Sequence, residues 1–175
     1  ALGLITAKSL RQDFSTVMRH DIFQPLGLKS TYINVPSEKI RNYAFGYTKD
    51  KAPVRVNPGV LSNEAYGVKT TAQDLARFLQ ANMGMLQLGS TLQASLDNTR
   101  KGYFKVGDMT QGLIWEEYVL PVDLEVLQKG NSAAVIYNPI PVLAQVPPSA
   151  PRPNVWVNKT GSTNGFGAYV AFVPS

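Results

Sequence analysis

Two runs of β-branched and aromatic residues near the end of the sequence, 155–160 and 168–173, are separated by a glycine-rich segment, 161–167. Such runs are typical of strands, and a short glycine-rich connection joins them into an antiparallel hairpin. Upstream of about residue 100, the apolar residues recur at helical spacing instead. Helices followed by antiparallel strands predict an α+β protein rather than a parallel α/β protein.

The spacing predicts three helices, at residues 9–25, 71–84 and 90–98. Ser9 and Gln12 resemble a capping box at the start of the first helix, and Ser90 and Gln93 resemble another at the start of the third. The stretch from 30 to 68 has no sustained period. Its prolines and aromatic residues predict a long, irregular but packed loop.

The second half of the sequence predicts strands. Residues 103–106 and 111–118 are rich in aromatic and branched side chains. Residues 139–153 contain six prolines. Because proline cannot donate a backbone hydrogen bond to a neighbouring strand, we expect this segment to be a loop that cannot pair as a central strand.

Composition excludes several classes of function. The net charge is +5, from 17 Lys and Arg against 12 Asp and Glu, but the basic residues are scattered. Nucleic-acid binding needs clustered positive charge, so we expect none. The sequence has no cysteine and one histidine, which argues against a metal site. No apolar stretch is long enough to predict a membrane span.

The strand around Lys159 carries the chemistry. Alternation along a strand places Lys159 on the same face as Val155 and Val157, just before Gly161. Because Gly161 lacks a Cβ, a ligand can approach the backbone closely there. Lys159 can offer an ammonium to a carboxylate, and Ser162 can offer a backbone N–H to an oxyanion. The alternative is an ordinary solvated lysine beside a hairpin turn.

The tripeptide Lys159-Thr160-Gly161 is also one of the sequence elements of serine β-lactamases and penicillin-binding proteins. Its surroundings, Asn158 to Pro174, resemble the class C β-lactamase version. Four upstream segments resemble the same family in the same order: 25–28, 42–47, 58–59 with 64–71, and 107–113 with 115–116. The sequence is therefore similar to class C serine β-lactamases over nearly all of residues 22–174.

The resemblance implies a β-lactamase/transpeptidase-like α+β fold, with helices packed on an antiparallel sheet and the active site between them. It implies that 1–175 form a single, partial domain of that kind. Within it, 1–29 would be helical, 30–70 an Ω-like loop, 71–99 helical, and 100–175 strands with a proline-rich loop.

The resemblance also assigns roles to six residues. Lys159 would interact with the catalytic tyrosine and with the substrate carboxylate, and Ser162 would supply an oxyanion-hole N–H. Thr160 and Gly161 would line the cleft, Tyr66 would border the pocket for the acyl side chain, and Asn131 would border its opposite side. For Tyr66, Thr160 and Asn131, a purely structural role is the alternative. No metal and no organic cofactor is implied.

The sequence also departs from the family. No serine is followed by lysine three positions later, so the S-x-x-K nucleophile motif is missing. We expect the family's Tyr-x-Asn element to be absent as well. Both lie upstream of this region in the family, so we expect the remainder of the enzyme in another segment or in a second chain. Ile114 stands where the family typically has glycine, which casts doubt on a regular strand there.

The resemblance therefore implies β-lactam hydrolysis through a serine acyl-enzyme, with a preference for cephalosporins, in a periplasmic protein whose partner is a small-molecule β-lactam. The 175 residues alone are expected to be inactive. The alternatives are a penicillin-binding D-alanyl-D-alanine carboxypeptidase or an esterase on the same scaffold, or a non-catalytic fragment.

Overall fold

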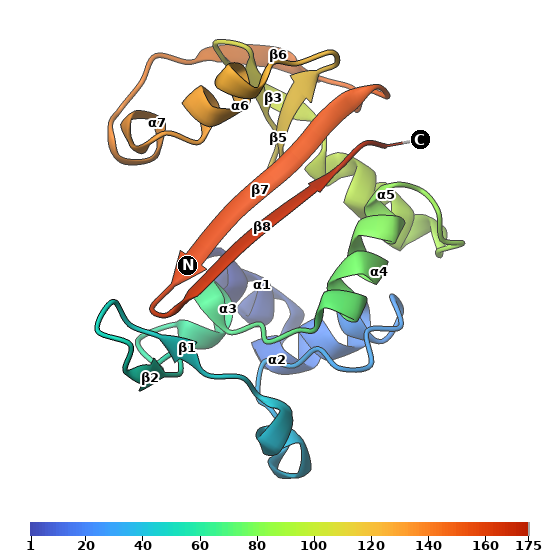
Figure 1. Ribbon diagram of the computed structural model, residues 1–175. Helices are drawn as coiled ribbons and strands as arrows, with labels where there is room; N and C mark the ends of the chain where they lie inside the picture. Colours follow the sequence, from blue (N-terminus) through green and yellow to red (C-terminus); the bar gives the residue numbers. More distant parts are fainter. Residues whose placement is uncertain (175) are drawn as a thin grey trace. The chain divides into compact units, whose positions relative to one another are not determined.

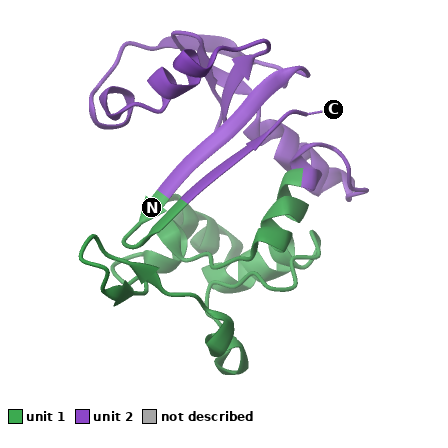
Figure 2. Cartoon of the chain, viewed as in Figure 1, with its two compact units in different colours: residues 1–79, 162–167 green, residues 80–161, 168–175 purple. Residues whose placement is uncertain are grey.

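The computed structural model describes residues 1–174, which form two compact units (Figure 2). Unit 1 comprises Ala1–Leu79 with Ser162–Gly167, and unit 2 comprises Gln80–Gly161 with the described residues 168–174. Helices dominate the first half of the chain and antiparallel strands the second (Figure 1), which confirms the α+β prediction. Within the described residues, no helix has the length and apolar character required to cross a membrane.

Unit 1 begins with three short helices, where the sequence predicts one: α1 Leu2–Leu10, α2 Phe14–Val17 and the π-helix η1 Met18–Phe23. The predicted capping box is wrong, because Ser9 lies in the last turn of α1. Arg11 adopts a left-handed conformation that ends α1. The carboxylate of Asp13 then caps α2 by accepting a hydrogen bond from the Thr16 backbone N–H at 3.2 Å.

The irregular stretch after Ser30 contains short elements: η2 Ser37–Asn42, β1 Gly46–Tyr47, β2 Pro53–Val54 and α3 Ser62–Tyr66. Its packing includes an aromatic sandwich, in which the Arg55 guanidinium lies 4.6 Å from the Tyr43 ring centre and 4.1 Å from that of Phe45. Guanidinium groups are attracted to aromatic faces, so this contact holds two distant parts of the loop together.

The two ends of this stretch meet. Tyr32 and Lys69 exchange two backbone hydrogen bonds of 2.8 Å. The Lys69 Nζ also donates to the carbonyl of Ile33 at 2.9 Å, and burial lowers the pKa of Lys69. The backbone of residues 32–33 is therefore held in place by hydrogen bonds to Lys69.

The helix α4 Ala72–Asn82 begins where the sequence predicts, because Thr71 Oγ1 accepts a hydrogen bond from the Asp74 backbone N–H at 3.2 Å. The buried Asp74 carboxylate in turn accepts hydrogen bonds of 2.7 Å from the Ser30 N–H and the Thr31 hydroxyl. One side chain thus ties the first turn of α4 to the loop that precedes Tyr32.

Unit 2 is built on a six-stranded sheet in the order β6-β3-β4-β5-β7-β8. Its strands are β3 Gly102–Val106, β4 Met109–Gln111, β5 Glu116–Val119, β6 Leu143–Ser149, β7 Val155–Thr163 and β8 Phe166–Phe172. The predicted strand at 111–118 is interrupted, because Gly112 to Trp115 form an irregular connection in which Ile114 is exposed. Ile114 therefore crowds no strand.

The proline-rich segment is not wholly a loop, which corrects the prediction. Residues Leu143–Ser149 form β6, which pairs with β3 at the edge of the sheet. An edge strand needs hydrogen bonds on one side only, so it tolerates Pro147 and Pro148, whose ring nitrogens cannot donate.

Three helices accompany the sheet in unit 2: α5 Ser90–Thr99, α6 Leu124–Gly130 and α7 Ala133–Tyr137. The sequence does not predict α6 and α7, which are short and lack buried residues. Gly89, not Ser90, is the residue at the N-cap of α5, so the capping box proposed there is also wrong. The Tyr118 hydroxyl of β5 packs so closely against Gly130 of α6 that a Cβ there would collide with it.

The core of unit 2 combines aromatic packing with a buried ion pair. The rings of Trp115 and Phe172 meet edge to face at 5.1 Å between centres. The Arg100 Nε lies 3.2 Å from Glu117 Oε1, and both side chains are less than 10% exposed, at 8% and 2%. Burial raises the pKa of Glu117, and the nearby Arg100 guanidinium opposes that rise.

We predict that Arg100→Met in the native protein lowers the free energy of unfolding at neutral pH by about 3–5 kcal/mol, because it leaves a buried charge without its partner. Without Arg100 the pKa of Glu117 rises further. The folded state then holds a proton that the unfolded state releases, so stability falls as pH rises above about 4–5. The loss should therefore be smaller at pH 5 than at pH 7, as measured by urea unfolding.

The matched control is the double variant Arg100→Met with Glu117→Met, which removes both charges and should recover much of the stability. An Arg100→Met loss that is equal at both pH values, or that the double variant only deepens, contradicts the prediction.

Candidate active site

Four of the six predicted site residues, Lys159 to Ser162, lie in the second half of β7. Pairing with β5 sets their positions, with Glu116 opposite Asn158 and Glu117 opposite Val157. Val155 and Val157 are buried, and Lys159 follows them at the point where β7 becomes more exposed. The alternation that predicts Lys159 beside two core valines thus matches the burial along the strand.

The ammonium of Lys159 forms an ion pair with a neighbouring strand. Its Nζ lies 2.6 Å from Glu116 Oε1, and the two side chains are 39% and 13% exposed. An ammonium has three N–H donors. Two of them are unused within the described part of the chain, so Lys159 is held at one point and can still bind an anion.

Sequence reasoning gave Glu116 no role. In the sequence, Glu116 belongs only to the segment 115–116 that resembles the class C family. No local pattern reveals the contact, because 43 residues separate Glu116 from Lys159 along the chain. An acidic residue in a strand next to the lysine-bearing strand is the only available signal, and the strand order is needed to use it.

Two buried oxygens beside this ion pair have no hydrogen-bond partner among residues 1–174: Glu116 Oε2 and Asn158 Oδ1. The Asn158 Nδ2 donates to the Glu116 carbonyl at 3.3 Å, so the orientation of the amide is fixed. Buried acceptors are usually satisfied by a donor or a water molecule. Both oxygens therefore provide positions where a donor would be stabilised.

The residues after Lys159 become progressively more accessible. Thr160 is half-buried, whereas Gly161 and Ser162 are exposed. A Cβ added at Gly161 would meet no described atom within 4 Å. The backbone at Gly161 can thus be approached closely, as the glycine at this position predicts.

The other two predicted site residues lie elsewhere in sequence and structure. Tyr66 is the last residue of α3 in unit 1; it is 39% exposed, and its hydroxyl faces Gly59. Asn131 follows α6 in unit 2 and donates through Nδ2 to the Leu127 carbonyl at 3.0 Å, which satisfies a carbonyl at the helix end. A role for either residue in substrate binding stays a prediction.

The expected absence of a Tyr-x-Asn spacing is wrong, because Tyr32-Ile33-Asn34 has it. These residues belong to unit 1, and the Tyr32 hydroxyl donates to the Lys29 carbonyl at 3.1 Å. The sequence has no S-x-x-K motif for such a tyrosine to serve. The match is therefore one of spacing and does not supply the family's catalytic tyrosine.

Comparison with known proteins identifies the scaffold. The β-lactamase family matches the chain along all of residues 1–175. The chain belongs to the β-lactamase family. A β-lactamase of Psychrobacter immobilis is 46% identical over 173 residues, which cover 99% of this chain and 43% of that protein. The chain thus spans less than half the length of this curated relative.

Solved structures agree with this assignment. A β-lactamase/D-alanine carboxypeptidase from Pseudomonas syringae superimposes with a TM-score of 0.94 at 53% identity, covering 98% of this chain and 48% of that one. A class C β-lactamase in complex with cefoxitin superimposes with a TM-score of 0.89 at 47% identity, covering 99% and 48%. The predicted β-lactamase-like α+β fold, and the resemblance to class C enzymes over a partial length, are confirmed.

We predict a small coupling energy between Lys159 and Glu116 of this β-lactamase-family chain. A double-mutant cycle with Lys159→Gln and Glu116→Gln should give about 1 kcal/mol or less in the native protein, because the lysine is exposed enough for water and salt to screen the pair. The coupling, measured by urea unfolding, should decrease between 50 mM and 500 mM salt, conditions that shorten the screening distance. A larger coupling that does not respond to salt contradicts this view.

Proposed function

We propose that the native protein hydrolyses β-lactams, and cephalosporins in particular, through a serine acyl-enzyme, with this chain supplying the strand that binds and activates the substrate. One observation carries the proposal. Lys159 presents an ammonium with two unused donors immediately before the accessible backbone of Gly161 and Ser162. The membership of the chain in the β-lactamase family supports it.

The chemistry divides between these groups. The substrate carboxylate binds the Lys159 ammonium, which positions the lactam carbonyl near the end of β7. As a nucleophile attacks, negative charge develops on the carbonyl oxygen, and the Ser162 backbone N–H donates to it. Thr160 and Gly161 line the cleft. Tyr66 borders the pocket for the acyl side chain, and Asn131 borders the opposite side of that pocket. The lactam C–N bond then breaks, its nitrogen takes up the proton released by the serine, and the acyl group stays on the serine as an ester. Water hydrolyses this ester, which releases the opened product and restores the serine.

The nucleophile must come from outside these residues. The sequence contains no serine with a lysine three positions later, so residues 1–175 alone are expected to be inactive. A periplasmic location remains a prediction from the class C resemblance. No metal or organic cofactor is needed for the proposed steps.

We predict that Lys159→Gln in the native protein lowers kcat/KM for a chromogenic cephalosporin by roughly tenfold to a hundredfold, because a hydrogen bond to a charged group contributes about 1.5–3 kcal/mol. The control is Lys39→Gln, which removes the same charge from the exposed helix η2 and should leave kcat/KM unchanged. Equal effects of the two substitutions would indicate that only net charge matters and would sink the proposed role.

A D-alanyl-D-alanine carboxypeptidase is the second candidate function. The Pseudomonas syringae neighbour is described by both activities, which gives this alternative specific support. The two functions share acylation and differ in how fast water releases the acyl group.

Rapid mixing of the native protein with a penicillin, followed by mass spectrometry of the adduct, distinguishes the two functions. We expect the penicilloyl adduct to disappear within seconds, as turnover of a β-lactamase requires. If the adduct persists for hours and the protein releases D-alanine from a peptide ending in D-Ala-D-Ala, the protein is a carboxypeptidase and the proposed β-lactamase function is wrong.

A further inference from the structure

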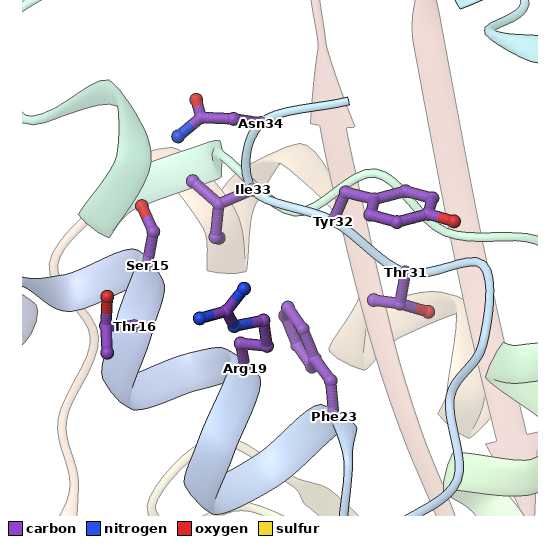
Figure 3. Close-up of a pocket in the computed structure, with 8 residues that line it drawn as sticks. All are labelled: Ser15, Thr16, Arg19, Phe23, Thr31, Tyr32, Ile33 and Asn34. Carbon is purple, nitrogen blue, oxygen red and sulfur yellow. The ribbon is translucent and has the colours of Figure 1, made fainter. Parts of the chain in front are cut away.

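A pocket lies within unit 1, and none of its lining residues belongs to β7. Its volume is about 220 Å³, and it lies between the helices α2 and η1 and the loop that follows Thr31 (Figure 3). Pockets for drug-sized ligands hold roughly 300–1,000 Å³. This one therefore suits a smaller molecule.

The loop wall of the pocket is fixed by three interactions, two of which involve Lys69. The Thr31 hydroxyl donates to the buried Asp74 carboxylate at 2.7 Å, Tyr32 pairs through its backbone with Lys69, and the Ile33 carbonyl accepts from Lys69 Nζ at 2.9 Å. A wall held in this way keeps its shape without a ligand. Such pre-organisation lowers the entropic cost of binding.

The opposite wall carries a positive charge without a carboxylate partner. The Arg19 guanidinium is directed into the pocket between Ile33 and Phe23 (Figure 3). Its only hydrogen bond in the described part of the chain is a 3.3 Å contact with the Nε2 of His20. None of the residues that line the pocket is acidic. The guanidinium therefore keeps free donors for an external anion.

Other groups complete a site of mixed character. The side chains of Ser15 and Asn34 also line the pocket (Figure 3). Phe23 and Ile33 are buried and apolar. An arginine fork matches the two oxygens of a carboxylate, and apolar walls match an adjoining hydrocarbon group.

We propose that this pocket binds a small organic carboxylate, with the carboxylate on the Arg19 guanidinium and the hydrocarbon group against Phe23 and Ile33. Ser15 and Asn34 supply additional hydrogen-bond donors. The site is separate from the proposed β-lactam chemistry and does not depend on it. No residue of the pocket belongs to β7, so occupation of the pocket requires no substrate at Lys159.

The test uses benzoate and its neutral isostere benzamide as probes of the native protein, by isothermal titration calorimetry at constant ionic strength. We expect saturable benzoate binding that is at least about tenfold tighter than benzamide binding, because a charge-assisted pair stabilises only the anion. Arg19→Gln should remove this preference. Arg41→Gln, which deletes an exposed arginine of η2 outside the pocket, should preserve it.

Hydrolysis of a chromogenic cephalosporin by Arg19→Gln should be unchanged, which separates this site from the proposed active site. Equal binding of benzoate and benzamide would show that the pocket does not select a carboxylate. Equal losses of binding in the two arginine variants would show that Arg19 has no specific role. Either result overturns the proposal. So does the absence of saturable binding, which would mean that another part of the native protein fills the pocket.

Discussion

The register between β5 and β7 is the constraint on which the rest of unit 2 depends. Glu116 and Glu117 are consecutive in β5, so their side chains leave opposite faces of the strand. In the observed register, Glu117 meets the buried Arg100 and Glu116 meets Lys159. A slip by one residue would exchange these faces and leave Arg100 without its carboxylate. The register between β5 and β7 thus sets the positions of both Glu117 in the core and Glu116 in the candidate site.

The two ion pairs are similar in composition but serve different purposes. Arg100 and Glu117 are both buried, so each charge requires the other, and the pair anchors the end of α5 to the sheet. Lys159 is partly exposed, and its charge remains available to an anion. Burial decides the difference, because water can replace a lost partner at Lys159 but not at Arg100.

Local patterns predicted the elements whose signals are local. The threonine that starts α4 and the burial of Val155 and Val157 follow from neighbouring residues. The last hairpin was predicted with a turn at 161–167, and that turn is too long. The strand β7 continues to Thr163 and β8 begins at Phe166, because Gly165 with its positive φ completes a two-residue connection. The capping box at Ser9 failed because Asp13 provides a better cap after a left-handed break at Arg11. The strand β6 was not predicted, because six prolines favour a loop and exclude only pairing as a central strand. The strand order places β6 at the edge of the sheet, where proline is tolerated.

For the candidate site, the sequence by itself determined the chemistry of one strand: a lysine, a glycine and a following backbone N–H at the end of an alternating β-segment. It also determined the family, because those residues stand in a long run of matching neighbours. Tertiary structure alone decided that Glu116 binds Lys159 and that Arg19 enters a fixed pocket. Both depend on contacts between residues far apart along the chain, which strand register and loop closure create and which no local pattern encodes.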